Sequence, residues 1–180
     1  REGCVANKVE HRGGVGVLDD AVDEDGSVFL VMELLEGETL EARCQRQGGR
    51  LAPADALVII HALLDVLASP HQHGVPHRDV TPSNVFVTHE GAVKLLDFGI
   101  ARLREPDSEA ITGSVPGTLG TPGFMPPEQA RGLWQELDAR TDLWAVGAVL
   151  YRTLAGRSVH VGRTPSELLW YGLPIRLQTQ

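Results

Sequence analysis

The sequence of 180 residues predicts one α+β domain, in which short antiparallel strands accompany longer helices. Apolar runs at residues 15–18 and 28–32 flank an acidic stretch that ends in Asp25-Gly26. Because Asp-Gly is a strong turn signal, two antiparallel strands are expected there. Further along, apolar side chains recur at the spacing of one helix face: Leu57, Ile60, Leu64 and Leu67.

Three helices are expected. After Gly37, residues 39–46 predict a short polar helix. Pro53 stands where a longer helix would begin, and Pro70 is expected to end it after about four turns. Residues 143–154 are apolar on nearly every face, which predicts a helix buried on all sides.

A second small hairpin and a long loop complete the expected elements. Residues 85–87 and 93–96 are apolar and flank His89-Glu90-Gly91, which indicates two short strands joined by a turn. From 102 to 121 the apolar pattern gives way to Ser, Thr, Gly, Pro and acidic residues. Loops of this length inside a domain are usually functional.

Composition excludes some classes of function. The net charge of -8 argues against nucleic-acid binding, because a phosphate backbone attracts a basic surface. Cys4 and Cys44 match no metal or redox spacing, which favours two reduced thiols in a cytoplasmic protein. No apolar run approaches the ~20 residues that span a bilayer, so no membrane segment is expected in this chain.

Three polar residues have a chemically suggestive placement. Asp79 and Asn84 lie in the loop before the second hairpin, and Asp97 directly follows its second strand. The hairpin would bring Asn84 and Asp97 together in an oxygen-rich site suited to Mg²⁺. Asp79 would then be free to accept a proton from a hydroxyl group.

These residues stand in longer motifs. They are His77-Arg78-Asp79 with Asn84, Asp97-Phe98-Gly99, Pro126-Pro127-Glu128 and Asp142-Leu143-Trp144. One tripeptide alone occurs by chance, but all of them in this order resemble the protein kinase family, of the bacterial eukaryote-like serine/threonine type. The resemblance covers roughly residues 2 to 170.

The resemblance implies a protein-kinase-like fold that is truncated at both ends. Residues 1–36 would belong to a partial N-lobe with a β-sheet, residues 37–170 to a mostly helical C-lobe, and residues 171–180 stay unassigned. The implied reaction is transfer of the ATP γ-phosphate, with Mg²⁺, to Ser or Thr hydroxyls of protein substrates. Self-association for autophosphorylation is a further implied possibility.

Site roles follow from the resemblance alone. Asp79 would be the catalytic base, Asn84 and Asp97 the Mg²⁺ ligands, and Glu2 the helix-C glutamate. The nucleotide would contact the gatekeeper Met32, the hinge residues Glu33 and Leu35, Phe86 on the floor of the adenine pocket, and Thr81. Ala6, Val17, His77 and Phe98 would form a stack between the lobes, with Asp142 bracing the catalytic loop from beneath.

Regulatory residues are implied in the same way. Arg78 would pair with a phosphate on the activation segment, and Thr121 would help to hold Asp79. Thr112, Ser114 and Thr118 are candidate autophosphorylation sites, although each could equally be a solvated loop hydroxyl. His71 and His73 lack further ligands at metal spacing, so a zinc site is disfavoured.

Departures from the family pattern leave two functions open. The chain shows no Gly-rich loop and no strand lysine, Thr81 replaces a usual Lys, and no Arg partner for Glu128 is recognisable. We therefore expect the 180 residues alone to be poorly active or inactive, and Glu128 to be unpaired. An active kinase is favoured because Asp79, Asn84 and Asp97 are intact; the alternative is a pseudokinase or scaffold without phosphoryl transfer.

Overall fold

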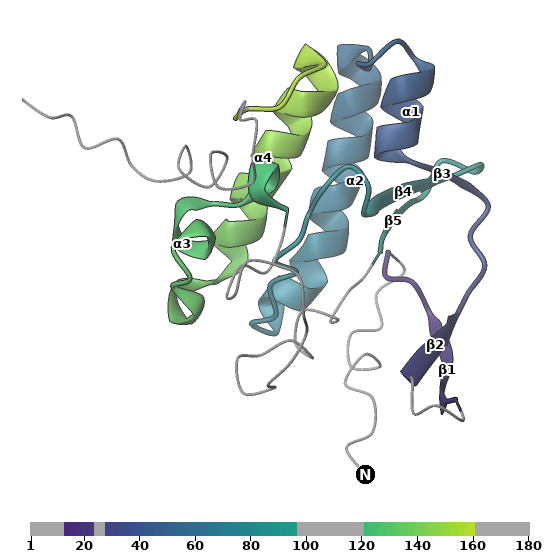
Figure 1. Cartoon of the computed structure of the whole chain (residues 1–180). Helices are drawn as coiled ribbons and strands as arrows, with labels where there is room; N and C mark the ends of the chain where they lie inside the picture. The colour runs from purple at the N-terminus through teal and green to yellow at the C-terminus, as the bar shows by residue number, and fades with distance from the viewer. Residues whose placement is uncertain (1–12, 24–27, 97–120, 161–180) are drawn as a thin grey trace, which may run out of the picture.

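The computed structural model describes residues 13–23, 28–96 and 121–160, which form two antiparallel sheets and four helices (Figure 1). The elements within these ranges are β1 (Val17–Val22), β2 (Val28–Met32), β3 (Gly37–Thr39), α1 (Leu40–Arg46), α2 (Pro53–Gln72), β4 (Val85–Thr88), β5 (Val93–Leu95), α3 (Pro127–Ala130) and α4 (Ala139–Ala155). Short 3-10 turns, η3 (Pro122–Phe124) and η4 (Trp134–Glu136), flank α3. The α+β class is confirmed.

Helices α2 and α4 lie side by side and form the centre of the core (Figure 1). They run antiparallel, because His71 at the end of α2 contacts Asp142 in the first turn of α4. At the other end, the N–H of Leu51 donates to the carbonyl of Thr153 at 2.8 Å. Sheet β3-β4-β5 packs against the same core through Val85, Val87, Val93 and Leu95.

The buried face of α2 is not the one that the leucine spacing predicts. Leu57 and Leu64 are 56% and 38% exposed, whereas Leu63 is fully buried. The buried stripe consists of Ala56, Ile59, Ile60, Leu63, Val66, Leu67 and Pro70. Two overlapping stripes of apolar residues share Ile60 and Leu67, and contact with α4 and β5 selects between them.

Pro70 does not end α2, which continues to Gln72. Proline lacks the N–H that would donate to the carbonyl four residues earlier, so Pro70 removes one hydrogen bond of α2, but only two residues before the helix ends. The carbonyl of Pro70 is itself used, because the N–H groups of His73 and Val75 both donate to it at 3.0 Å. The helix is therefore longer than the sequence predicts.

Helix α4 is not buried on all sides. Its buried residues are Thr141, Asp142, Ala145, Val146, Ala148, Val149 and Thr153, while Leu143 is 48% exposed. The side chain of Asp138 caps the first turn by accepting from Arg140 N. Gly156 ends the helix in the left-handed conformation, at φ 70°, where glycine carries no steric penalty.

The second hairpin is confirmed as β4 and β5, but β3 is an addition that the sequence did not indicate. Strand β3 pairs with β4, so the three strands form one antiparallel sheet. A Cβ on Gly37 would lie 2.2 Å from the carbonyl oxygen of Val87, so only glycine fits. Directly after β3, Thr39 caps α1 by accepting from Ala42 N, which confirms the predicted short helix.

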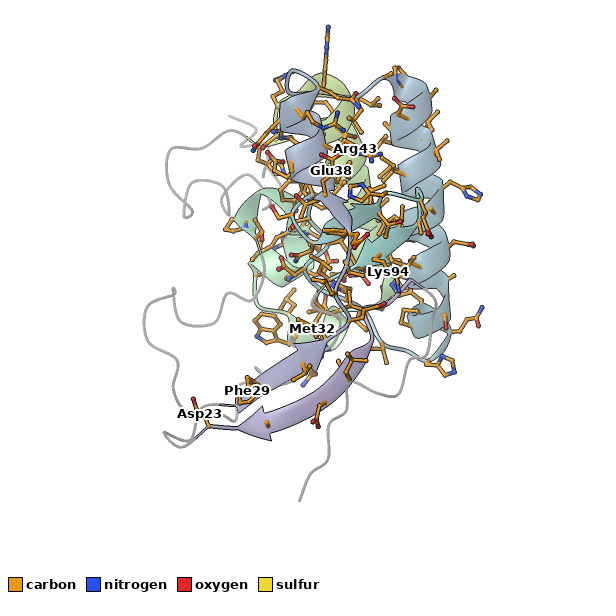
Figure 2. All side chains as sticks on the ribbon, turned by 90° about the vertical axis from the view of Figure 1, so that its right-hand side faces the viewer. Asp23, Phe29, Met32, Glu38, Arg43 and Lys94 are labelled. Carbon is orange, nitrogen blue, oxygen red and sulfur yellow. The ribbon has the colours of Figure 1, made fainter. Side chains whose placement is uncertain are left out.

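The first hairpin is present with a shifted boundary. Strand β1 begins at Val17 and extends to Val22, so Asp19 and Asp20 belong to a strand rather than to the turn. These residues pair with Val31 and Leu30 in an isolated two-stranded sheet. Acidic residues are tolerated there because the strand is an exposed edge. Lys94 of β5 lies at the junction between this hairpin and the rest of the domain (Figure 2).

One helix of the described part, α2, is long and apolar enough to cross a membrane by length and composition. The core helix of a globular domain passes the same test, and α2 packs against α4 and β5. That the chain has no membrane segment thus stays a prediction. Cys44 is buried in the core, and burial raises the pKa of its thiol; Cys4 lies outside the described residues.

Candidate active site

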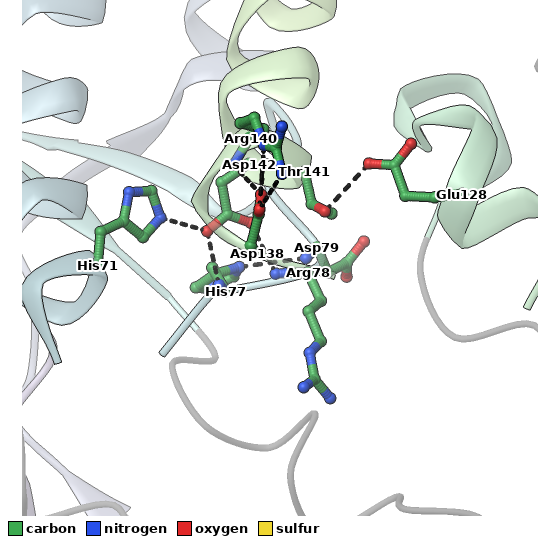
Figure 3. Close-up of polar contacts among 9 residues, drawn as sticks. All are labelled: His71, His77, Arg78, Asp79, Glu128, Asp138, Arg140, Thr141 and Asp142. Carbon is green, nitrogen blue, oxygen red and sulfur yellow. Dashed lines mark hydrogen bonds and ion pairs between the residues drawn. The ribbon is translucent and has the colours of Figure 1, made fainter. Parts of the chain in front are cut away.

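A buried carboxylate supports the predicted catalytic loop, residues 77–84, from beneath. Asp142 is fully buried in the first turn of α4, and it accepts hydrogen bonds from the backbone N–H of His77 at 2.7 Å and of Arg78 at 2.8 Å. The ring of His71 donates to the same carboxylate at 2.6 Å (Figure 3). The bracing contact that the resemblance implies is present. No motif in the sequence indicates that His71 takes part in this contact.

His77 connects the catalytic loop to the end of β5. Its Nδ1 accepts from the N–H of Asp79 at 3.3 Å, and its Nε2 lies 2.9 Å from the carbonyl oxygen of Leu96. A ring whose Nδ1 accepts carries its proton on Nε2, so Nε2 donates to Leu96. Leu96 N in turn donates to Asn84 O at 2.8 Å. The residue before Asp97 is therefore tied to Asn84.

The carboxylate of Asp79 is oriented from both sides. Thr121 donates to Oδ1 through its backbone N–H and its hydroxyl, both at 3.0 Å. The side-chain amide of Asn84 donates to Oδ2 at 3.1 Å and to the backbone carbonyl of Asp79 at 2.9 Å. The expected contact between Thr121 and Asp79 is thus present. Such a carboxylate is preorganised to accept a proton at a defined position.

The chemistry of Asn84 fits a metal ligand. Its Nδ2 donates to Asp79, and its amide oxygen takes no part in that contact. An amide oxygen beside carboxylates is the hard donor that Mg²⁺ prefers. Within the described ranges no three or more His, Cys, Asp or Glu side chains are arranged so that they could hold a metal ion, and Asp97 lies outside those ranges.

Thr81 is placed inside the loop rather than on its surface. It is 4% exposed, and its hydroxyl accepts from Asn84 N at 3.3 Å. Its carbonyl accepts from the N–H groups of Asn84 at 3.0 Å and of Val85 at 3.2 Å. Thr81 therefore fixes the turn that presents Asn84. Its contact with a nucleotide stays a prediction.

A cavity of about 500 Å³ opens beside Asp79. It is lined by Glu41, Asp79, Thr81, Pro82, Ser83, Asn84, Thr121, Phe124, Arg152 and Ser158. Glu41 and Arg152 form an ion pair at 3.1 Å in its wall, which joins α1 to α4. A hydroxyl-bearing side chain that enters this cavity can approach Asp79.

The predicted nucleotide residues lie around the junction of the two sheets. Met32 is 45% exposed at the end of β2, and Leu35 and Phe86 are half-buried. Glu33 accepts from Lys94 Nζ and Gly16 N, each at 2.8 Å, and the Lys94 hydrogen bond is the main cause that lowers the pKa of its carboxyl. Lys94 lies in β5, so this ion pair links the hinge to that strand, and Phe86 is the register partner of Lys94 in β4. The sequence did not reveal it.

Arg78 combines an unusual backbone conformation with a buried side-chain nitrogen. Its φ is 70°, in the left-handed region that non-glycine residues rarely occupy. Its Nε is buried and has no hydrogen-bond partner among the described residues. Gln129 of α3 donates to its carbonyl at 2.6 Å, a contact that sequence reasoning missed.

Glu128 is not unpaired, contrary to expectation. Its Oε1 accepts from the hydroxyl of Thr141 at 3.1 Å, so α3 is joined to the first turn of α4 (Figure 3). The threonine hydroxyl satisfies the carboxylate where no arginine was recognisable. The remaining predicted residues lie outside the described ranges: Glu2, Ala6, Asp97, Phe98, Thr112, Ser114 and Thr118.

The structure therefore places an oriented aspartate and asparagine in a loop that Asp142 of α4 supports, and the comparisons identify the family. The family model described as protein kinase domain matches residues 1–172. The chain belongs to the protein kinase family. Members of this family generally use ATP and Mg²⁺, and its curated relatives here are bacterial serine/threonine kinases.

Three relatives illustrate the similarity. The chain is 39% identical over 168 residues to the probable serine/threonine-protein kinase CE0033 of Corynebacterium efficiens, covering 92% of the chain and 25% of that protein. It is 38% identical over 172 residues to the serine/threonine-protein kinase pkn2 of Myxococcus xanthus, covering 94% and 20%. It is 37% identical over 168 residues to the serine/threonine-protein kinase PknB of Mycolicibacterium smegmatis, covering 92% and 26%. The chain thus spans about a quarter of the length of these relatives.

Proposed function

We propose that this chain carries the catalytic centre of a serine/threonine protein kinase, which transfers the γ-phosphate of ATP to Ser or Thr hydroxyls of proteins. The observation that carries the proposal is the Asp79 carboxylate, held by Thr121 and Asn84 at the edge of the 500 Å³ cavity. The similarity to bacterial serine/threonine kinases supports the same reaction.

The chemistry assigned to the chain is a proton transfer coupled to phosphoryl transfer. The substrate hydroxyl oxygen forms a bond to the γ-phosphorus while the bond to the β-phosphate oxygen breaks, and Asp79 accepts the hydroxyl proton. Thr121 and Asn84 keep the accepting carboxylate in one orientation. Asn84 and Asp97 would hold Mg²⁺, which neutralises charge on the phosphates when bound.

Nucleotide binding would need residues beyond those found here. Met32, Glu33, Leu35 and Phe86 offer one side of an adenine site, with Thr81 at the loop. In the protein kinase family a Gly-rich loop and a lysine that pairs with the helix-C glutamate complete such a site. Without such a charged clamp we expect a rate lower by on the order of 10²–10³.

Regulation through Arg78 is part of the proposal. A buried guanidinium nitrogen without a partner among the described residues is suited to pair with a phosphate. Thr112, Ser114 and Thr118 are the proposed sources of that phosphate, added when two copies of the chain associate. We also propose that the protein is cytoplasmic and acts on protein substrates. A net charge of -8 argues against a nucleic-acid partner.

The test uses the protein encoded by the longest open reading frame that contains this chain. The purified protein is first treated with a phosphatase to remove earlier phosphorylation. With ATP and Mg²⁺ the protein should phosphorylate itself or a general protein substrate on Ser or Thr. Asp79→Asn and Asp97→Ala should each abolish transfer, while Asp65→Asn on the exposed side of α2 should not. Unchanged phosphorylation in Asp79→Asn would contradict the role of Asp79 as the base, and no phosphorylation by the parent protein would favour the scaffold alternative.

A further inference from the structure

The peptide that precedes the proposed catalytic base is held in a strained conformation. Arg78 is the only non-glycine residue in the described ranges with a positive φ, at 70°. A side chain in this region is disfavoured, so the surrounding structure has to enforce it. The next residue is Asp79, whose direction depends on the same peptide plane.

Both polar groups of Arg78's backbone are bound by side chains from different elements. Its N–H donates to Asp142 Oδ1 of α4 at 2.8 Å. Its carbonyl accepts from Gln129 Nε2 of α3 at 2.6 Å. Gln129 is 1% exposed, and a buried side-chain amide is costly unless it is hydrogen-bonded. Asp142 thus fixes one end of the residue and Gln129 the other.

The segment that carries Gln129 contacts the catalytic loop twice. Thr121, eight residues before Gln129, holds the Asp79 carboxylate, while Gln129 holds the carbonyl of the preceding residue. Next to Gln129, Glu128 is bonded to Thr141, the neighbour of Asp142. These contacts form a closed ring through α3, α4 and the loop, in which Gln129 supplies a hydrogen bond to the strained peptide.

We propose that Gln129 is a positioning residue, which fixes the carbonyl of Arg78 and thereby aims Asp79 at the substrate hydroxyl. The inference rests on the proposed kinase activity, because it assigns Gln129 a part in that reaction. Without the amide donor, the Arg78 peptide is free to rotate toward a relaxed conformation. Asp79 would then point away from the position that Thr121 and Asn84 define.

The first test compares Gln129→Leu with Gln135→Leu in the full-length protein. Gln135 is exposed in the neighbouring turn η4 and serves as a matched control. Gln129→Leu should lower kcat about 10²-fold, since a small misplacement of a reacting group has this effect. KM for ATP should stay within twofold, and Gln135→Leu should match the parent. An equal loss in both variants, or a loss confined to KM, would overturn the proposal.

A pH profile separates hydrogen-bond donation from mere packing. In Gln129→Glu the ionised carboxylate cannot donate to the Arg78 carbonyl, but the protonated acid can. Relative to the parent, the kcat of Gln129→Glu should therefore rise as pH falls from 8 to 6, because burial favours the protonated form. The kcat of Gln129→Leu should not recover. Parallel profiles for both variants would show that donation is irrelevant.

A double mutant tests whether Gln129 is needed because the backbone of Arg78 is strained. Glycine adopts positive φ freely, so Arg78→Gly should make Gln129 less necessary, and the added effect of Gln129→Leu should fall below about tenfold. Amide NMR gives a readout independent of turnover: the Asp79 N–H resonance should shift in Gln129→Leu and not in Gln135→Leu. An inactive parent would contradict the proposed function, whereas an unmoved Asp79 resonance would contradict this inference.

Discussion

At the scale of single residues, one buried carboxylate accepts several of the hydrogen bonds that hold the site together. Asp142 is fully buried and accepts from two backbone N–H groups and from the His71 ring. A hydrogen bond to a buried charged acceptor contributes more than a neutral one, and its loss leaves the donors unsatisfied. The stability of the loop is therefore coupled to α4.

Asp142→Ala should lower the free energy of unfolding by about 3 kcal/mol or more, since the N–H groups of His77 and Arg78 would lose their acceptor. Asp138→Ala is the comparison: it removes the N-cap of the same helix, at a partly exposed position, and should cost about 1 kcal/mol. Urea unfolding measures both. Similar losses in the two variants would mean that the buried contacts add little.

The sequence indicates some of these contacts and conceals others. Thr121 and Asp142 stand at fixed places in recognisable motifs, so their contacts with the catalytic loop could be predicted. His71 and Gln129 could not, because they act on partners 71 and 51 residues away, and for Gln129 the partner is a backbone carbonyl. A carbonyl has no signature in a sequence. The pair of Lys94 with Glu33 joins two side chains 61 residues apart, and no motif connects them in the sequence.

At the scale of elements, the sequence predicted the features that depend on residues close together in the chain. The cap of α1 at Thr39 and the turn between β4 and β5 depend on neighbours in the chain, and both are present. Strand β3 depends on pairing with β4, far along the chain, and was not foreseen. The face of α2 likewise depends on α4 and β5, not on its own periodicity.

Leu63→Ala in α2 should destabilise the protein by about 2–5 kcal/mol, because it leaves a cavity in the core. Leu57→Ala changes the same residue type on the exposed face of the same helix, and its effect should stay within about 0.5 kcal/mol. Thermal or urea unfolding distinguishes them. A larger destabilisation by Leu57→Ala than by Leu63→Ala would mean that the face predicted from the leucine spacing is the buried one.

At the scale of the whole molecule, the two sheets meet along residues 13–16. Leu95 N donates to Gly13 O at 2.8 Å, Lys94 Nζ donates to Gly14 O at 3.1 Å, and Gly16 contacts Glu33. This segment also lies against α2, where a Cβ on Gly13 would come 2.1 Å from a methyl carbon of Val66. The junction therefore has no room for a side chain at Gly13.

Gly13→Ala should cost about 1–3 kcal/mol, because the added methyl group overpacks the contact with Val66. Gly16→Ala adds the same group where the nearest atom is 3.7 Å away, so its effect should stay within about 0.5 kcal/mol. Hydrogen exchange should locate the loss in β5 and residues 13–16. Equal protection in both variants would show that the junction along residues 13–16 has room for the added methyl group.

The ring of contacts around Arg78 also has a consequence for the order in which the molecule is made. The catalytic loop leaves the ribosome before the residues that shape it, since Gln129 follows Arg78 by 51 positions and Asp142 by 64. Until α3 and α4 have been synthesised and docked, the Arg78 peptide has neither its donor nor its acceptor. The nascent chain thus acquires the geometry of Asp79, its proposed catalytic base, late, after most of the described helices are in place.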